Sequence, residues 1–207
     1  MKAKSPCKPA GRPRSFDTGK ALDRAVGVFW RKGYEGASLS DLTRAMGINR
    51  PSLYAAFGDK EQLFRRVLDR YDEGPASYCS AALEEPTSRA VVERLLYGTA
   101  EMLTSPQNPG GCLKVQGALA CGNGAASVRK ELISRRLAGE AALRQRLNRA
   151  KIEGDLPPDA NPATLAGYIV TLIQGMSVQA ASGAKRSELN HIIDIALQSW
   201  PCFRRNT

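Results

Sequence analysis

The segment that decides the fold is SLSDLTRAMGINRPSLYAAF, residues 38–57. Ser38 and Asp41 have the spacing of a capping box, which predicts the start of a short helix. Gly47 supplies the tight turn that ends this helix, and Asn49 caps a second helix that runs to the end of the segment. Two short helices joined by a glycine turn are typical of a helix-turn-helix, although the same pattern also occurs as an ordinary helical hairpin within a core.

Apolar residues at helical spacing predict further helices on both sides of this segment. The expected helices span residues 17–32, 39–46, 50–57, 59–71, 88–103, 125–153, a stretch after Pro162, and 189–200. The chain shows no internal repeat and no convincing alternation typical of strands. We therefore predict an all-α fold, with an N-terminal three-helix DNA-binding domain and a C-terminal helical domain for ligand binding and dimerisation.

Charge divides the chain unevenly. The formal net charge is +10, and residues 1–72 hold 15 Lys and Arg but 8 Asp and Glu, whereas residues 73–207 hold 15 and 12. An excess of positive charge at one end favours a polyanionic partner there. We expect three parts, which are a flexible basic arm over 1–14, a helix-turn-helix domain over 15–72 and a ligand-binding and dimerisation domain over 73–207. Arg12 and Arg14 of the arm are expected to contact DNA in the minor groove or at phosphates, although a plain solubilising tail has the same composition.

Cysteine usage and hydropathy limit the setting in which the chain works. The five cysteines are scattered and form no C-x-x-C pair, which favours a reducing cytoplasm over a disulfide framework. The most apolar stretch is too short to span a bilayer, so we expect no membrane partner. With one histidine and no clustered metal ligands or phosphate-binding motif, we expect neither a metal nor a cofactor.

Several side chains in and around the helix-turn-helix suit contact with DNA. Residues suited to base edges on the second helix are Asn49, Arg50, Ser52 and Ala55. Hydroxyls and an ammonium at helix ends or flanks can hold phosphates, namely Ser38, Ser40, Tyr54 and Lys60. Among these, Arg50 is the residue that we expect to contact a guanine with both ends of its guanidinium.

The same residues carry a family resemblance over about residues 16–71. It consists of Ala25-x-x-x-Phe29, the run Gly33-Tyr34-Glu35-Gly36-Ala37-Ser38, then Leu42, Met46-Gly47-Ile48, and Ser52-Leu53-Tyr54-x-x-Phe57-x-x-Lys60-x-x-Leu63. This pattern resembles the N-terminal domain of the TetR/AcrR family of bacterial repressors. The resemblance implies that Ser38, Ser40, Tyr54 and Lys60 clamp the DNA backbone, and that Arg50, Pro51, Ser52 and Ala55 face the major groove. Ala55 departs from many relatives, which place a larger side chain there.

A single helix-turn-helix buries too little surface for strong selectivity, so we expect a homodimer on a palindromic operator. Two apolar stripes near the end of the chain are the candidates for the dimer interface. They contain Leu172, Met176, Ile192, Ile193 and Trp200. The alternative is that these stripes fill the core of a single chain.

A regulator of this kind needs a site for its signal, expected in residues 75–207 and for an unknown small molecule. Candidate lining residues are Tyr97, Met102, Tyr168 and Gln174, although such residues also occur as plain core. Cys112 follows a flexible loop at the expected start of a helix, where Lys114 and Arg129 add positive potential to a thiol sensor. The alternative is that Cys112 is a small buried apolar residue.

The sequence therefore predicts a sequence-specific transcriptional regulator, a repressor that a small-molecule or thiol-reactive signal releases from DNA, and not an enzyme. Two other classes stay open at this point. An architectural protein would bind DNA without sequence preference, but it has no need of a large C-terminal domain. A small helical enzyme using Cys112 would need a nearby base, and the sequence offers none.

Overall fold

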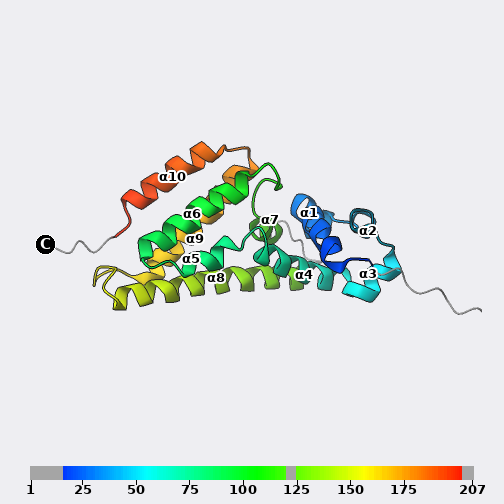
Figure 1. Ribbon diagram of the computed structural model, residues 1–207, viewed down its shortest axis with the longest axis horizontal. Helices are drawn as coiled ribbons and strands as arrows, with labels where there is room; N and C mark the ends of the chain where they lie inside the picture. Colours follow the sequence, from blue (N-terminus) through cyan, green and yellow to red (C-terminus); the bar gives the residue numbers. More distant parts are fainter. Residues whose placement is uncertain (1–15, 120–124, 202–207) are drawn as a thin grey trace, which may run out of the picture.

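The computed structural model describes residues 16–119 and 125–201, and within these ranges it contains helices and no strand. The helices are α1 (Thr18–Gly36), α2 (Leu39–Met46), α3 (Arg50–Phe57), α4 (Lys60–Glu73), α5 (Tyr78–Leu83), α6 (Ser88–Thr104), α7 (Leu113–Leu119), α8 (Ala126–Ile152), α9 (Pro162–Ala181) and α10 (Arg186–Gln198). Helices α1–α3 gather at one end, and α4 leads from them into a bundle along which the long α8 runs (Figure 1). The all-α prediction is confirmed. Arg12 and Arg14 of the expected arm lie outside the described residues.

Local capping places α2 and α3 where the sequence predicts them. Ser38 Oγ accepts a hydrogen bond from the Asp41 N–H at 3.0 Å, and Asp41 accepts one from the Ser38 N–H at 3.1 Å, which completes the capping box. Gly47 then takes a left-handed conformation with φ 70°, which a Cβ would strain. Asn49 Oδ1 accepts from the Ser52 N–H at 2.8 Å and starts α3. The turn between the two helices is therefore fixed by short-range chemistry.

The end formed by α1–α4 has a tightly packed apolar core. Leu42 of α2, Leu53 of α3 and Leu63 of α4 are fully buried, and full burial of such a side chain is worth about 1.5–3 kcal/mol. The rings of Phe29 and Phe64 meet edge to face, with centroids 4.9 Å apart. This packing holds α3 by its apolar side, so its opposite side faces solvent.

No break in the core separates this end from the rest of the molecule. The α4 helix carries buried side chains along its whole length, from Leu63 to Tyr71. The ring of Tyr71 contacts Trp30 of α1, with centroids 4.9 Å apart, and the same tyrosine also faces the C-terminal bundle. The division at residues 72 and 73 stays a prediction, and the structure makes the end of α4 common to both parts.

The bundle contains one short helix that the sequence pattern does not predict. The α5 helix spans six residues, and its preceding residue Ser77 makes no side-chain capping bond, so the usual signal for a helix start is missing. The longer helices α6, α8 and α9 agree with the expected ranges to within a few residues. Within the described ranges, no helix combines the length and the apolar character that a membrane crossing requires.

Candidate DNA-binding surface and ligand cavity

The recognition helix α3 presents one continuous exposed face. Leu53 and Phe57 point into the core, and the residues on the opposite side are exposed. These exposed residues are Arg50, Pro51, Tyr54 and Ala55. Their spacing of one and four residues places them on the same side of a helix. Ser52, also expected at this face, is half-buried beside the turn.

Arg50 and Ser40 form a pair across the helix-turn-helix. Arg50 Nη2 donates to Ser40 Oγ at 3.1 Å, and both side chains are exposed. Arg50 is the first residue of α3, whereas Ser40 lies in the first turn of α2. The contact holds the guanidinium near the turn, from which it can reach outward to a base edge or a phosphate.

Two of the expected contact residues already use their side chains within the fold. Ser38 Oγ donates to Asp41 Oδ2 at 2.7 Å, and Asn49 Oδ1 caps α3. Lys32 Nζ lies 2.8 Å from Asp41 Oδ1. The hydrogen bonds from Lys32 and Ser38 hold the pKa of Asp41 well below its usual range. Asp41 is therefore a carboxylate at neutral pH, and a phosphate at Ser38 would have to displace it.

Lys60 begins α4 beside an aromatic ring. Its Nζ lies 4.6 Å from the centroid of Tyr34, within the range of a cation–π contact. Burial lowers the pKa of Lys60, and the nearby Glu35 opposes this shift. The half-buried ammonium is thus held in place at the edge of the helix-turn-helix, as a contact to a phosphate requires.

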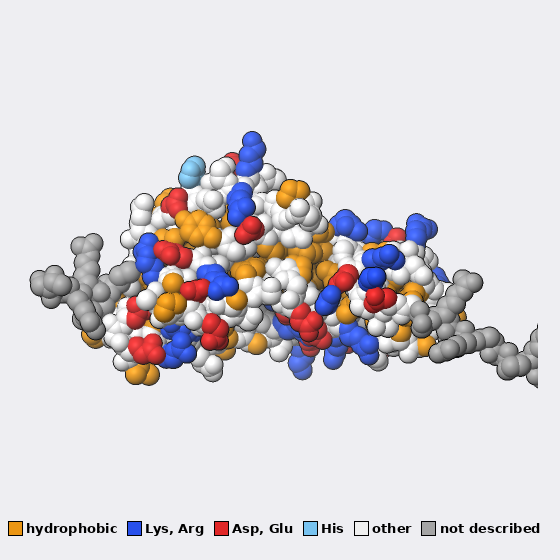
Figure 2. All heavy atoms as spheres, in the orientation of Figure 1, with side chains coloured by type: hydrophobic (Ala, Val, Ile, Leu, Met, Phe, Trp, Pro, Cys, Tyr) orange, Lys and Arg blue, Asp and Glu red, His pale blue; other side chains and the backbone are white. Residues whose placement is uncertain are grey.

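Three further basic residues extend the surface beyond the sequence prediction. Arg24, Arg31 and Arg44 are exposed on α1 and α2, and among the described residues none of them forms an ion pair or a side-chain hydrogen bond. Lys and Arg side chains stand out along the edge of the molecule over α1 and α2, whereas they alternate with Asp and Glu over much of the bundle (Figure 2). The charge count predicted that this end of the chain is basic, but which of its basic residues are exposed together depends on how α1 packs.

The bundle has a half-open cavity of about 460 Å³, lined by residues from α4 to α9. Most of its wall is apolar, and the apolar lining residues are Ala76, Leu83, Leu95, Met102, Val115, Leu143, Val170 and Ile173. On α8 the wall is formed by the small residues Ala138, Gly139 and Ala142, which leave room for the cavity. A volume of about 300–1,000 Å³ is typical of small-molecule sites.

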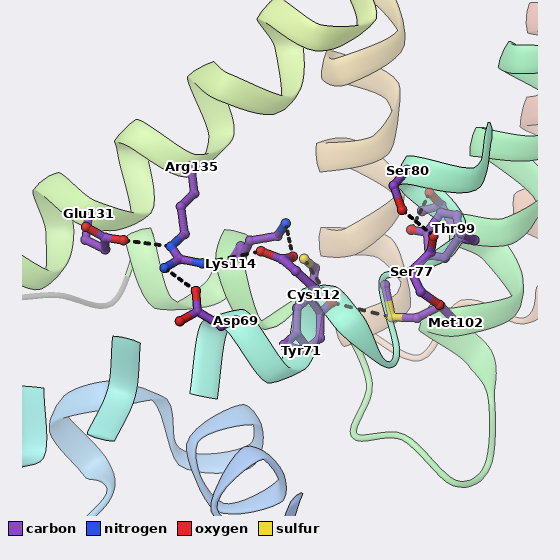
Figure 3. A network of polar contacts seen from close by, with 12 residues as sticks. Asp69, Tyr71, Ser77, Ser80, Thr99, Met102, Cys112, Lys114, Glu131 and Arg135 are labelled. Carbon is purple, nitrogen blue, oxygen red and sulfur yellow. Dashed lines mark hydrogen bonds and ion pairs between the residues drawn. The ribbon is translucent and has the colours of Figure 1, made fainter. Parts of the chain in front are cut away.

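Polar contacts join the cavity wall to the end of α4. Tyr71 Oη donates to Cys112 Sγ at 3.4 Å and lies 3.6 Å from Met102 Sδ. Burial raises the pKa of Tyr71 well above its usual value, so the hydroxyl keeps its proton. Figure 3 shows this tyrosine pointing to Cys112, with Lys114 beside it. Lys114 Nζ in turn lies 2.6 Å from Asp72 Oδ1.

A second set of contacts joins α8 and the Cys112 loop to the DNA-binding end. Arg135 reaches from α8 to Asp69 of α4, with Nη2 and Oδ1 2.7 Å apart (Figure 3). The buried Trp30 Nε1 of α1 donates to the Gly111 carbonyl oxygen at 2.9 Å. The residue before Cys112 is therefore bonded directly to α1. A molecule in the cavity would touch the groups that hold α1 and α4.

Two family models match this chain. One is described as bacterial regulatory proteins of the tetR family and matches residues 21–67. The other is described as the tetracyclin repressor-like C-terminal domain and matches residues 89–195. The chain belongs to the TetR family.

Relatives of this TetR family chain match it over nearly its whole length. The HTH-type transcriptional repressor ComR of Escherichia coli (strain K12) is 37% identical over 196 residues, 94% of this chain and 93% of that protein. The uncharacterized HTH-type regulator YezE of Bacillus subtilis (strain 168) is 30% identical over 90% of this chain and 97% of that protein. A solved structure of a cysteine mutant of the TetR family regulator CifR, complexed with 26-bp double-strand operator DNA, is 42% identical with a TM-score of 0.87. It covers 92% of this chain and 100% of that chain.

The cavity of this TetR family protein includes part of the expected ligand set. Met102, Cys112 and Gln174 line it, but Tyr97 and Tyr168 do not. Each of these tyrosines lies two residues before a lining residue of its helix, and two residues turn a side chain by about 200°. Tyr97 instead donates to Asp194 Oδ1 at 2.6 Å. Three of the five expected residues therefore line the cavity, together with Tyr71 and Arg135.

The charged residues that line the cavity were not predicted from the sequence, although the residue pattern of α8 indicates one of them. Buried apolar residues recur at Val128, Leu132 and Leu143, and continuing their helical spacing places Arg135 and Gly139 on the same stripe. A cation and a glycine on a buried stripe indicate either a paired charge or a cavity. Arg129, expected beside Cys112, is exposed and does not line the cavity.

The expected interface residues divide between the core and the surface of the TetR family chain. Met176, Ile193 and Trp200 are buried within a single chain, with exposed fractions of 5% or less. They offer little side-chain surface to a partner. Leu172 is half-buried and Ile192 is exposed, so an interface through these two residues stays a prediction. The alternative that the stripes fill the core holds for the other three.

Proposed function

We propose that this TetR family regulator is a repressor that binds a palindromic operator as a homodimer and leaves it when a small molecule occupies the cavity. The observation that carries the proposal is the face of α3 on which Arg50, Pro51, Tyr54 and Ala55 are exposed beside a basic surface. The 37% identity to a transcriptional repressor over nearly full length supports the same function. A regulator of bacterial transcription acts on the chromosome, so its place of action would be the cytoplasm.

Two copies would be needed because one α3 helix contacts few base pairs. Half-sites about one helical turn apart, or a multiple of it, suit a two-fold symmetric dimer. For its interface we propose the exposed side of α9 and α10. Leu172 is half-buried on α9, whereas Ile192 and Ile195 are exposed on α10, and Ile195 is 67% exposed. An exposed isoleucine of this kind loses water contact favourably on association.

Release would follow from the position of the cavity at the end of α4. Tyr71 and Asp72 line the cavity, and the same helix packs against the DNA-binding end. A molecule that fits better when α4 is displaced would shift the population towards a form in which the two α3 helices have the wrong spacing. The hydrogen bond from Trp30 to Gly111 would pass the same displacement to α1.

A thiol-reactive signal would act at the same place. Cys112 is 8% exposed and lines the cavity, so a reagent would reach it through the cavity and would break its contact with Tyr71. Treatment with iodoacetamide should release operator DNA from the wild type but not from Cys112→Ser. Cys79→Ser is the matched control, because Cys79 lines the same cavity but the hydrogen bond of Tyr71 goes to Cys112. Equal release from the wild type and Cys112→Ser would reject the thiol switch.

Other functions have less support. An enzyme using Cys112 would need a base beside the thiol, but the one histidine of the chain, His191, is exposed on α10 and does not line the cavity. A purely architectural protein would have no use for the cavity or for its contacts with α4. We therefore propose that the chain acts as a regulator and not as an enzyme.

The deciding experiment is footprinting of the intergenic DNA around the gene, followed by a reporter assay with and without the protein. We expect one protected palindrome with two half-sites, and lower reporter expression when the protein is present. Protection spread evenly over unrelated DNA would support the architectural alternative instead. Higher reporter expression in the presence of the protein would show an activator.

A further inference from the structure

Arg136 lines the cavity from α8 and has no ion-pair partner among the described residues. Its Nε is buried without a hydrogen bond, and within residues 16–119 and 125–201 its guanidinium takes part in no ion pair or side-chain hydrogen bond. The neighbouring Arg135 differs, because it contacts both Asp69 and Glu131 at 2.7 Å. A buried donor without a partner is costly, and the Nε of Arg136 is such a donor. Arg136 is therefore placed to meet a group that the described residues do not supply.

Most other polar groups of the cavity wall already have a partner. Lys114 pairs with Asp72, and the hydroxyls of Tyr78 and Thr99 lie 2.9 Å apart. Glu140 is one helical turn from Arg136 and also lines the cavity, but the two form no ion pair. Among the described lining residues, the cation without an ion pair is thus Arg136.

We propose that the effector of this cavity is an apolar molecule with one carboxylate, and that the carboxylate binds Arg136. The planar fork of a guanidinium matches the two oxygens of a carboxylate. The other walls are mostly apolar and suit a hydrocarbon body. A phosphate is a poorer fit, because its second negative charge would face Glu140 with no further free cation among the described lining residues. The proposal rests on the proposed function, since it names the effector class of the same cavity.

The test is isothermal titration calorimetry of the full-length protein, without DNA, with three probes of equal chain length. These are octanoate, 1-octanol and octylamine. We expect octanoate to bind about tenfold to a hundredfold tighter than 1-octanol, as a charge-assisted hydrogen bond predicts. Octylamine should bind weakest. Lengthening the acid should raise the affinity about fourfold per CH₂ until the cavity is filled.

Variants of α8 separate the site from general charge effects. Arg136→Gln should lose most of the preference for octanoate over 1-octanol, while Arg144→Gln should keep it. Arg144 is the matched control, because it lies on the same helix, is exposed and does not line the cavity. Glu140→Gln should bind octanoate more tightly, since it removes a negative charge near the carboxylate. This variant and Arg136→Lys keep the test usable if Arg136→Gln does not fold.

The outcomes separate this proposal from the proposed function. Equal binding of octanoate and 1-octanol, or equal losses in Arg136→Gln and Arg144→Gln, would overturn it, as would no binding by any acid of the series. Operator binding is measured on the same preparations by gel shift. If operator binding holds while the acids fail, the effector class is wrong and the regulator stands. If the acids bind through Arg136 but no operator is found, the repressor function fails and the carboxylate site stands.

Discussion

Replacement of Arg50 by alanine is expected to change which DNA sequence the protein prefers. Arg50 is exposed at the first position of α3, and its guanidinium makes one side-chain hydrogen bond among the described residues, to Ser40 Oγ. Both partners are exposed, so water replaces the lost bond at a cost of about 0.5–1.5 kcal/mol or less. The helix-turn-helix should therefore stay folded in Arg50→Ala.

The loss in DNA discrimination should be larger than this loss in stability. A guanidinium that contacts a guanine through both ends contributes about 1–3 kcal/mol of preference over the wrong base. A dimer on a palindrome makes the contact twice, so the expected loss is about 2–6 kcal/mol if the half-sites are additive. Ser40→Ala should cause a smaller loss with the same pattern, because it frees the arginine without removing it.

The assay is selection from a randomised operator library, followed by sequencing, with the wild type, Arg50→Ala and Arg44→Ala. We expect Arg50→Ala to lose base preference at one position of each half-site. Arg44 is exposed on α2 without an ion pair among the described residues, so its removal should weaken binding to all sequences alike. Unchanged preferences in Arg50→Ala, or a loss spread evenly over the operator, would refute the role given to Arg50.

Three further variants test other parts of the structure. Lys60→Ala should make the negative slope of log affinity against log salt less steep by about one per protomer, because one phosphate contact is lost. An unchanged slope in a salt titration would contradict this. Ser38→Ala should destabilise the fold by about 0.5–2 kcal/mol, since it removes the cap of α2, and urea unfolding at fixed protein concentration would measure the change. Trp30→Phe should cost about 1–3 kcal/mol because the buried Gly111 carbonyl loses its donor. In the same measurement, Trp200→Phe should cost less, since the Trp200 bond to Ser88 is longer at 3.4 Å.

The parts of the fold that short-range chemistry decides could be predicted from the sequence. The capping box of Ser38 and Asp41, the turn at Gly47 and the cap at Asn49 each involve residues within four positions of one another. Their geometry follows from the residue types alone. The exposed face of α3 could be predicted as well, because Leu53 and Phe57 are buried and leave the opposite side of the helix in solvent.

The cavity could not be predicted as a whole, because its wall comes from many helices. Tyr71 and Cys112 are 41 residues apart, and Trp30 and Gly111 are 81 residues apart, so no local pattern brings them together. The rotation of each helix about its own axis then decides which of its side chains face the cavity. Met102 does so, whereas Tyr97 on the same helix contacts Asp194 on the outside. An aromatic residue at helical spacing is therefore a weak guide to a ligand site.

The end of α4 is where DNA binding and the cavity depend on the same residues. Tyr71 contacts Trp30 on one side and Cys112 on the other, and Asp72 pairs with Lys114 at the cavity wall. Because Tyr71 is fully buried, a displacement of its ring requires its neighbours to move as well. We therefore expect a ligand that alters the cavity wall at Cys112 or Asp72 to change the packing of α1 and α4 without any contact to DNA. The hydrogen bond from Trp30 to Gly111 is a second contact between the Cys112 loop and α1. Loss of this bond alone, or of the Tyr71 contact alone, should therefore weaken the coupling between cavity and DNA-binding end and not abolish it.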